Sequence, residues 1–193
     1  QTIADFSHAK ELARTNIPIK VEIKIDTGMH RLGITPEHTK EIASLFSIPT
    51  FSISGMYTHL CVADSQTPED IAFSQKQIES FQFLINSLKA AGISLPPLHV
   101  QSSYGILNYP CLKYQFARVG ILLYGCHSQL EESCLMNPEV QPVLSLYSQI
   151  ALIREVEEGD TVGYGRTYLV NKRKRLAVIP IGYADGYPRS LSN

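Results

Sequence analysis

Aliphatic and charged residues alternate strictly near the start of the chain. Ile17, Ile19, Val21, Ile23 and Ile25 are aliphatic, whereas Lys20, Glu22, Lys24 and Asp26 are charged. Successive side chains of a β-strand point to opposite faces, so this pattern predicts a strand with one apolar face and one charged face. It is either a half-solvated edge strand or a strand that directs charge into a reaction site. The spacing alone favours the edge strand.

Strand and helix patterns alternate over the first two-thirds of the chain. We expect helices at residues 2–14, 35–46 and 68–92, and strands at 17–26, 51–60, 98–103 and 116–125. Pro36 and Pro68, each preceded by a threonine, mark the starts of the second and third helices, and Gly92 marks the end of the third. Parallel neighbours need a long crossover connection, so the repeated strand–helix–strand units predict a parallel sheet.

The pattern changes near residue 130, where we place a domain boundary. Residues 128–142 are polar and contain proline, and apolar stretches at 143–156, 161–170 and 175–187 then follow one another across short turns. Short turns between strands are typical of antiparallel β-structure. The sequence therefore predicts part of a β/α barrel or of a doubly wound sheet, followed by the start of a β-domain.

Composition and charge exclude several classes of protein. The chain has 193 residues, 44% of them hydrophobic and 18% charged, with a formal net charge of −1, which argues against disorder. Its one basic cluster, residues 172–175, sits in a turn, so we expect no nucleic-acid partner. The four cysteines lack zinc-site spacing, which predicts no metal and a reducing compartment. The sequence shows neither a signal peptide nor an apolar run of about 18 residues.

Polar and titratable residues recur at the ends of the expected strands. Lys24 and Arg31 belong to the first strand and its turn, His59 follows the second, His99 starts the third, and Arg118 lies in the fourth. Enzymes built on β/α barrels collect their active-site residues at the carboxyl ends of the strands. A single histidine is usually structural, but charged groups on successive strands favour a shared site.

Six motifs, read in order, resemble the pyridoxal-phosphate-dependent alanine racemases. They are KIDTGMHRLG, YTHLCVADS, HVQSSYG, FARVGILLYG, VGYGRTY and VIPIGYADGYPRSLSN, and the similarity covers about residues 18–193. The resemblance implies an α/β fold, with residues 1–130 as part of a TIM-type (β/α)8 barrel that binds the cofactor and residues 131–193 as the start of a C-terminal β-domain. It also implies pyridoxal 5'-phosphate as the cofactor and a homodimer whose active site is shared across the interface.

The resemblance assigns roles to six catalytic candidates, the first four of which form a chain. Tyr183 matches the tyrosine that serves as one acid/base group in the partner subunit's active site. Arg118 matches the arginine that faces the pyridine nitrogen and keeps it unprotonated, because two adjacent positive charges are unfavourable. His99 matches the histidine that supports this arginine, and His59 matches the one that links the arginine to the tyrosine.

The remaining matches concern the substrate and the phosphate. Arg31 matches the arginine near the cofactor phenolate and the substrate carboxylate, and Lys24 matches a lysine that is often carbamylated and then holds that arginine. Phosphate-binding positions are matched by Ser103, Gly120 and Ile121.

Departures from the family pattern leave alternatives open. The motif with the Schiff-base lysine is absent, so we expect this piece to be inactive alone, and Ser102 and Val119 replace the usual asparagine and proline. The resemblance implies a bacterial cytoplasmic enzyme that interconverts L- and D-alanine by two-base proton transfer and supplies D-alanine for peptidoglycan. The alternatives are a serine racemase of vancomycin-resistance type, whose parent chain can be tethered to the membrane, and a non-catalytic cofactor-binding or structural fragment.

Overall fold

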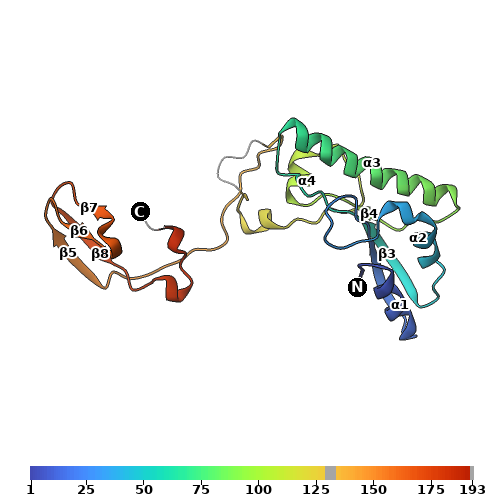
Figure 1. The fold of residues 1–193 in the computed structure, drawn as a ribbon, viewed down its shortest axis with the longest axis horizontal. Helices are drawn as coiled ribbons and strands as arrows, with labels where there is room; N and C mark the ends of the chain where they lie inside the picture. The colour runs from blue at the N-terminus through green and yellow to red at the C-terminus, as the bar shows by residue number, and fades with distance from the viewer. Residues whose placement is uncertain (129–133, 192–193) are drawn as a thin grey trace. The chain divides into compact units, whose positions relative to one another are not determined.

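The chain divides into two compact units, Gln1–Val143 and Leu144–Asn193, which are described separately. The computed structural model describes residues 1–128 and 134–191 (Figure 1). The domain boundary expected near residue 130 lies in the segment 129–133, outside the described residues.

A four-stranded parallel sheet forms the centre of the first unit. Its strands lie in the order β1 (Thr2–Ile3), β2 (Ile19–Lys24), β3 (Phe51–Tyr57) and β4 (Leu98–His99). The helices between them are α1 (Phe6–Arg14), the 3₁₀ turn η1 (Pro36–His38) with α2 (Thr39–Leu45), and α3 (Pro68–Ala90) (Figure 1). Right-handed crossovers between strands in sequential order place all helices on one face, as in the wall of a β/α barrel. A doubly wound sheet would reverse its strand order.

The position of β2 decides between the two interpretations of its alternating pattern. β2 lies between β1 and β3, so the edge strand that the spacing alone favoured is excluded, and the alternative of a strand that directs charge into a site remains. Val21, Ile23 and Ile25 are fully buried in the apolar core that also contains the inner face of α3. On the opposite face Lys24 is buried as well.

Helix α3 follows the sequence prediction closely. The Thr67 hydroxyl accepts the backbone N–H of Asp70 at 3.2 Å and caps the first turn. At the other end Gly92 adopts φ +79°, a left-handed conformation that suits glycine and stops the helix.

Two other expectations need correction. The expected helix at residues 2–14 begins only at Phe6, because Thr2–Ile3 pairs with β2 instead. The expected strand at 116–125 is wrong: Phe116 forms an isolated bridge to His99, and Ile121–Tyr124 forms the 3₁₀ turn η2. The Ser103 hydroxyl, at the start of α4 (Ser103–Asn108), accepts the backbone N–H groups of Gly120 and Leu122, which turns the chain away from the sheet.

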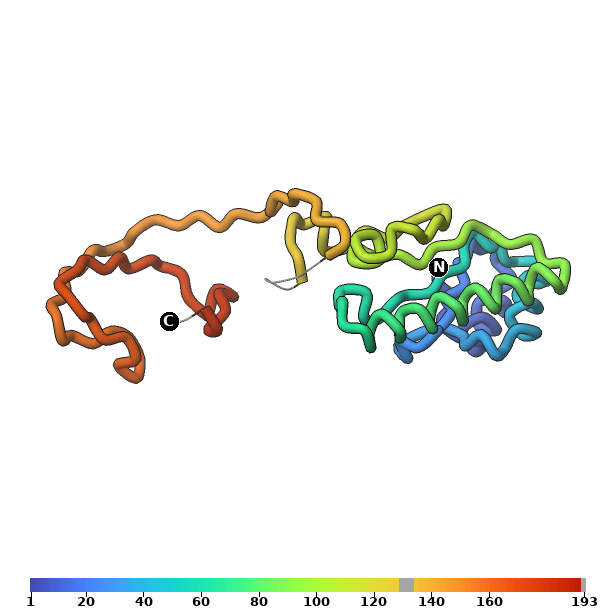
Figure 2. The backbone as a smooth tube through the Cα atoms, turned by 90° about the horizontal axis from the view of Figure 1, so that it is seen from above, coloured from blue at the N-terminus to red at the C-terminus, as the bar shows by residue number. Residues whose placement is uncertain are grey.

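The second unit contains two antiparallel strand pairs. β5 (Leu152–Val156) pairs with β8 (Lys174–Val178), and β6 (Thr161–Val162) pairs with β7 (Tyr168–Leu169), so the chain doubles back on itself within this unit (Figure 2). The 3₁₀ turns η3 (Tyr164–Arg166), η4 (Tyr183–Asp185) and η5 (Arg189–Leu191) complete it. Across the residues that the structure describes, no helix is long and apolar enough to cross a membrane.

Candidate active site

Arg118 contacts both His59 and His99, so three of the residues that the sequence singles out lie together. Its Nη1 contacts Nδ1 of His99 at 2.5 Å, and its Nη2 contacts Nδ1 of His59 at 3.2 Å. Nη2 also donates to the backbone carbonyls of Thr58 at 2.8 Å and of Val100 at 3.2 Å. A guanidinium can only donate hydrogen bonds, so Nδ1 of each histidine must accept. Both imidazoles are therefore neutral in this arrangement.

The electrostatics of the cluster agree with neutral histidines. Burial, together with the positive charges of Arg118, Arg31 and Lys24, lowers the pKa of His59 to about 4. Burial and Arg118 also lower the pKa of His99. Burial lowers the pKa of Arg118 too, but guanidinium groups stay protonated in proteins. At neutral pH the cluster thus presents one cation between two uncharged rings.

Two members of the cluster escaped the sequence analysis as site residues. The Tyr57 ring stacks on His99 with 4.7 Å between centroids, and the guanidinium carbon of Arg118 lies 4.7 Å from the centroid of the Tyr57 ring. Oε2 of Glu22 lies 3.4 Å from Nε2 of His99. The period-two pattern offers a signal for both, because Glu22 shares a strand face with Lys24, and Tyr57 lies two residues before His59.

Lys24 and Arg31 lie at the carboxyl end of β2 and in the loop after it. Burial and the charge of Arg31 lower the pKa of Lys24, whereas the charge of Asp26 opposes this shift. Among the described residues no hydrogen bond joins Lys24 to Arg31, and Arg31 is exposed. The loop is shaped by Asp26, whose Oδ1 accepts the backbone N–H groups of Gly28, Met29 and His30 at 2.9–3.1 Å.

The three candidate phosphate residues also lie together. Oγ of buried Ser103 accepts the N–H of Gly120 at 2.9 Å, and Ile121 follows as the first residue of η2. A first helical residue has no intrahelical partner for its N–H, which leaves that group available to an anion.

Tyr183 lies in the second unit, in η4, with 71% of its surface exposed. Its turn is closed by the Gly182 N–H, which donates to Oδ2 of Asp185 at 2.9 Å, and by Gly186 at φ +90°. This exposure leaves the tyrosine ring accessible to solvent. Across the residues that the structure describes, no group of three or more histidine, cysteine or acidic side chains is arranged to hold a metal ion.

The fold and the cluster can be compared with known proteins. The family profile "Alanine racemase, N-terminal domain" matches residues 1–128, two-thirds of the chain. The chain belongs to the alanine racemase family. The profile of the alanine racemase C-terminal domain matches residues 143–193.

Relatives and solved structures agree with this assignment. The chain is 44% identical to a serine/alanine racemase of Enterococcus gallinarum over its whole length, covering 28% of that protein. It is 35% identical to an alanine racemase of Carboxydothermus hydrogenoformans over 97% of its length, covering 50% of that protein. The crystal structure of alanine racemase from E. faecalis matches with a TM-score of 0.81 and 30% identity, covering 98% of this chain and 51% of that one. The chain therefore spans between about a quarter and a half of the proteins that it resembles, and the family assignment confirms the expected fold class.

Proposed function

We propose that the chain is the cofactor-binding part of a pyridoxal-phosphate-dependent racemase that interconverts L- and D-alanine. The observation that carries this proposal is the Arg118 guanidinium, held by neutral His59 and His99. In the described part of the chain no residue accepts a hydrogen bond from its Nε–H, so this edge can donate to an aromatic ring nitrogen. A fixed cation at that point keeps the ring nitrogen unprotonated.

The phosphate end fits the same cofactor. The Ser103 oxygen accepts two backbone N–H groups, so its own proton is free to donate to a phosphate oxygen. The N–H of Ile121 adds a second donor beside it. When bound, pyridoxal phosphate supplies the electron withdrawal that makes the Cα–H of an amino acid acidic.

The protein groups then hold the substrate and move its proton. The partner subunit's Tyr183 delivers or removes the Cα proton on one side. Lys24, once carbamylated, holds Arg31 toward the substrate carboxylate. This assignment requires a homodimer, and the second base is a lysine outside this chain.

The product fits a bacterial role. D-alanine would be made in the cytoplasm for peptidoglycan, by a free enzyme or by the cytoplasmic part of a membrane-tethered parent. Serine is the second candidate substrate, since the chain is 44% identical to a serine/alanine racemase but 35% identical to alanine racemases such as that of C. hydrogenoformans. A serine hydroxyl adds one polar atom, which an apolar pocket rejects only weakly.

The test uses the full-length protein that contains this chain. Purified with pyridoxal phosphate, it should show the absorbance of the bound cofactor and racemise L-alanine or L-serine in a chiral assay. Tyr183→Phe should lower kcat/KM by about 100-fold or more, and equally in both directions because the equilibrium constant of a racemisation is unity, whereas Tyr187→Phe, in the same motif, should not. A protein that binds no pyridoxal phosphate, or equal rates for the two variants, would contradict the proposal.

A further inference from the structure

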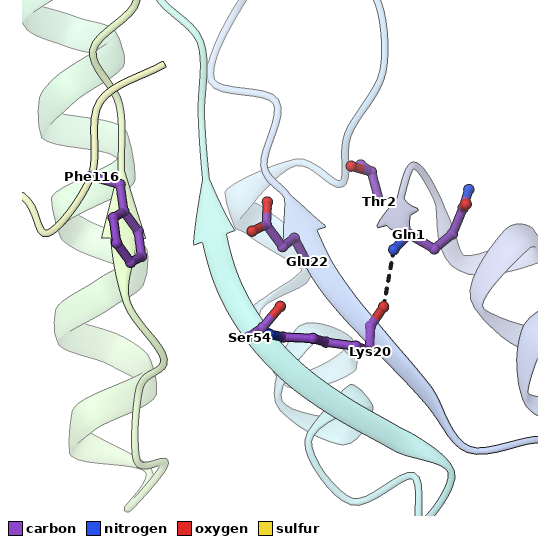
Figure 3. Close-up of a pocket in the computed structure, with 6 residues that line it drawn as sticks. All are labelled: Gln1, Thr2, Lys20, Glu22, Ser54 and Phe116. Carbon is purple, nitrogen blue, oxygen red and sulfur yellow. Dashed lines mark hydrogen bonds between the residues drawn. The ribbon is translucent and has the colours of Figure 1, made fainter. Parts of the chain in front are cut away.

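Glu22 occupies a position that the roles above do not explain. It lines a cavity of about 510 Å³ beside the sheet, with Gln1, Thr2, Lys20, Ser54 and Phe116. Figure 3 shows Glu22 between β2 and β3, with Phe116 beyond β3. Its side chain is 39% exposed, yet one carboxylate oxygen reaches the buried His99.

The sheet is locally irregular in a way that makes room for this carboxylate. Val21 pairs with Ile53 but Glu22 pairs with Gly55, so Ser54 is an extra residue in β3, and its hydroxyl donates to the Val21 carbonyl at 3.1 Å. A Cβ at Gly55 would lie 3.0 Å from Oε1 of Glu22. Such bulges re-aim side chains next to active sites, and a glycine in a strand permits close approach.

The hydrogen-bond pattern of His99 gives the carboxylate its role. Nδ1 of His99 accepts from Arg118, so the ring proton resides on Nε2, which faces Oε2 of Glu22 at 3.4 Å. The opposite tautomer would direct an N–H of His99 at the N–H groups of Arg118. The stacked Tyr57 ring keeps the imidazole in the plane that joins the two partners.

We propose that Glu22 is a positioning residue for the racemase reaction: it accepts the Nε2–H of His99 and so fixes the tautomer that holds Arg118 toward the cofactor ring. This inference rests on the proposed function for its catalytic consequence, but the contact itself belongs to the protein alone. Where a carboxylate orients a metal-binding histidine in this way, its loss typically costs about 10–100-fold in affinity or activity, and we expect an effect of the same order here.

The experiment compares full-length variants in two readouts. The first is the ring-nitrogen NMR spectrum of ¹⁵N-histidine-labelled protein without cofactor, in which the His99 signals are assigned by their loss in His99→Asn. Glu22→Met removes the acceptor and should abolish the Nε2–H pattern, whereas Glu22→Gln, whose amide oxygen can still accept, should retain it. The second readout is kinetic: Glu22→Met should lower kcat by about 10-fold or more with KM little changed, and Glu22→Gln should restore the rate to within about 3-fold of wild type.

Glu41→Gln is the matched control, because Glu41 lies 3.7 Å from Nδ1 of His38 in an exposed pair remote from the cluster. It should leave the His99 signals and the rate unchanged. An unchanged His99 pattern in Glu22→Met, or a Glu22→Gln variant as impaired as Glu22→Met, would overturn the proposal. A wild-type protein without racemase activity would refute the proposed function instead, while the nitrogen spectrum would still test the contact.

Discussion

Replacing Gly33, in the loop that carries Arg31, with alanine should destabilise the protein far more than the same replacement at a glycine without close neighbours. Gly33 has φ +123°, and its N–H donates to the Ala4 carbonyl at 2.8 Å. A Cβ at this position would lie 2.7 Å from the backbone nitrogen of Asp26 and 3.0 Å from the carbonyl carbon of Ile25. Both atoms belong to backbone that is fixed beside the sheet, because Ile25 and Ile34 form a parallel bridge.

The free-energy cost of Gly33→Ala has two contributions, backbone strain and overpacking. A non-glycine residue at such a positive φ costs about 1–3 kcal/mol, and an overpacked site costs a further 1–3 kcal/mol or so. We therefore expect Gly33→Ala to cost about 3 kcal/mol or more, which lowers Tm by roughly 6 °C or more in a domain of about 200 residues.

Gly92→Ala is the control for this experiment. Gly92 has φ +79°, but no atom lies within 4 Å of the position that a Cβ would take there. Only the backbone strain remains, so the cost should be about 1 kcal/mol. Calorimetry of the full-length variants measures both. Equal Tm values for the two alanine variants would refute the reasoning from the backbone contact.

Three further changes test the buried polar groups. Although burial opposes it, backbone N–H groups lower the pKa of Asp26, so Asp26→Asn should cost about 1–3 kcal/mol at pH 7, and the Tm difference from wild type should shrink as the pH falls below about 4. The lowered pKa of His59 means that the folded protein binds fewer protons than the unfolded chain between pH 6.5 and about 4. The free energy of unfolding should therefore decrease as the pH is lowered from 6.5 to about 4, and it should decrease less steeply in His59→Asn. Parallel Tm–pH curves for the wild type and this variant would contradict the prediction. Buried Gln77 accepts the N–H of Cys61 and donates to the His59 carbonyl, so Gln77→Leu should cost about 1–3 kcal/mol in denaturant unfolding, against no more than about 0.5 kcal/mol for the exposed Gln75→Leu on the same helix.

The sequence predicts a helix correctly where residues at the helix ends themselves determine where it starts and stops. The cap at Thr67 and the glycine at Gly92 bound α3 whatever surrounds it, and the structure confirms both ends. The apolar run from Phe116 onward has the composition of a strand but not its structure. Its N–H groups bond to the side chain of Ser103, a partner distant in sequence that no periodicity identifies.

The site residues also divide into those that local sequence signals predicted and one, Glu22, whose role depends on a partner distant in sequence. His59, His99 and Arg118 follow from their places at strand ends together with the family motifs, and the structure brings them into contact. Glu22 and Lys20 are equivalent in the alternating pattern, yet only Glu22 reaches His99. Tyr57 pairs with both Lys24 and His99, so Glu22 lies nearer to His99 along β2 than Lys20 does. This register depends on strand pairing, which the sequence of one strand does not reveal.

The choice of partners for Arg118 explains why the cluster suits a basic ring nitrogen. In the described part of the chain the guanidinium is held by two imidazoles and two carbonyls, and no carboxylate touches it directly. A carboxylate in direct contact would neutralise the charge and occupy the donors that a ligand needs. Neutral acceptors orient the guanidinium but leave its charge in place, and the low pKa of His59 keeps that partner uncharged well below neutral pH. Glu22 supplies its negative charge one residue away, behind His99, where it can orient the cluster without competing for the ligand.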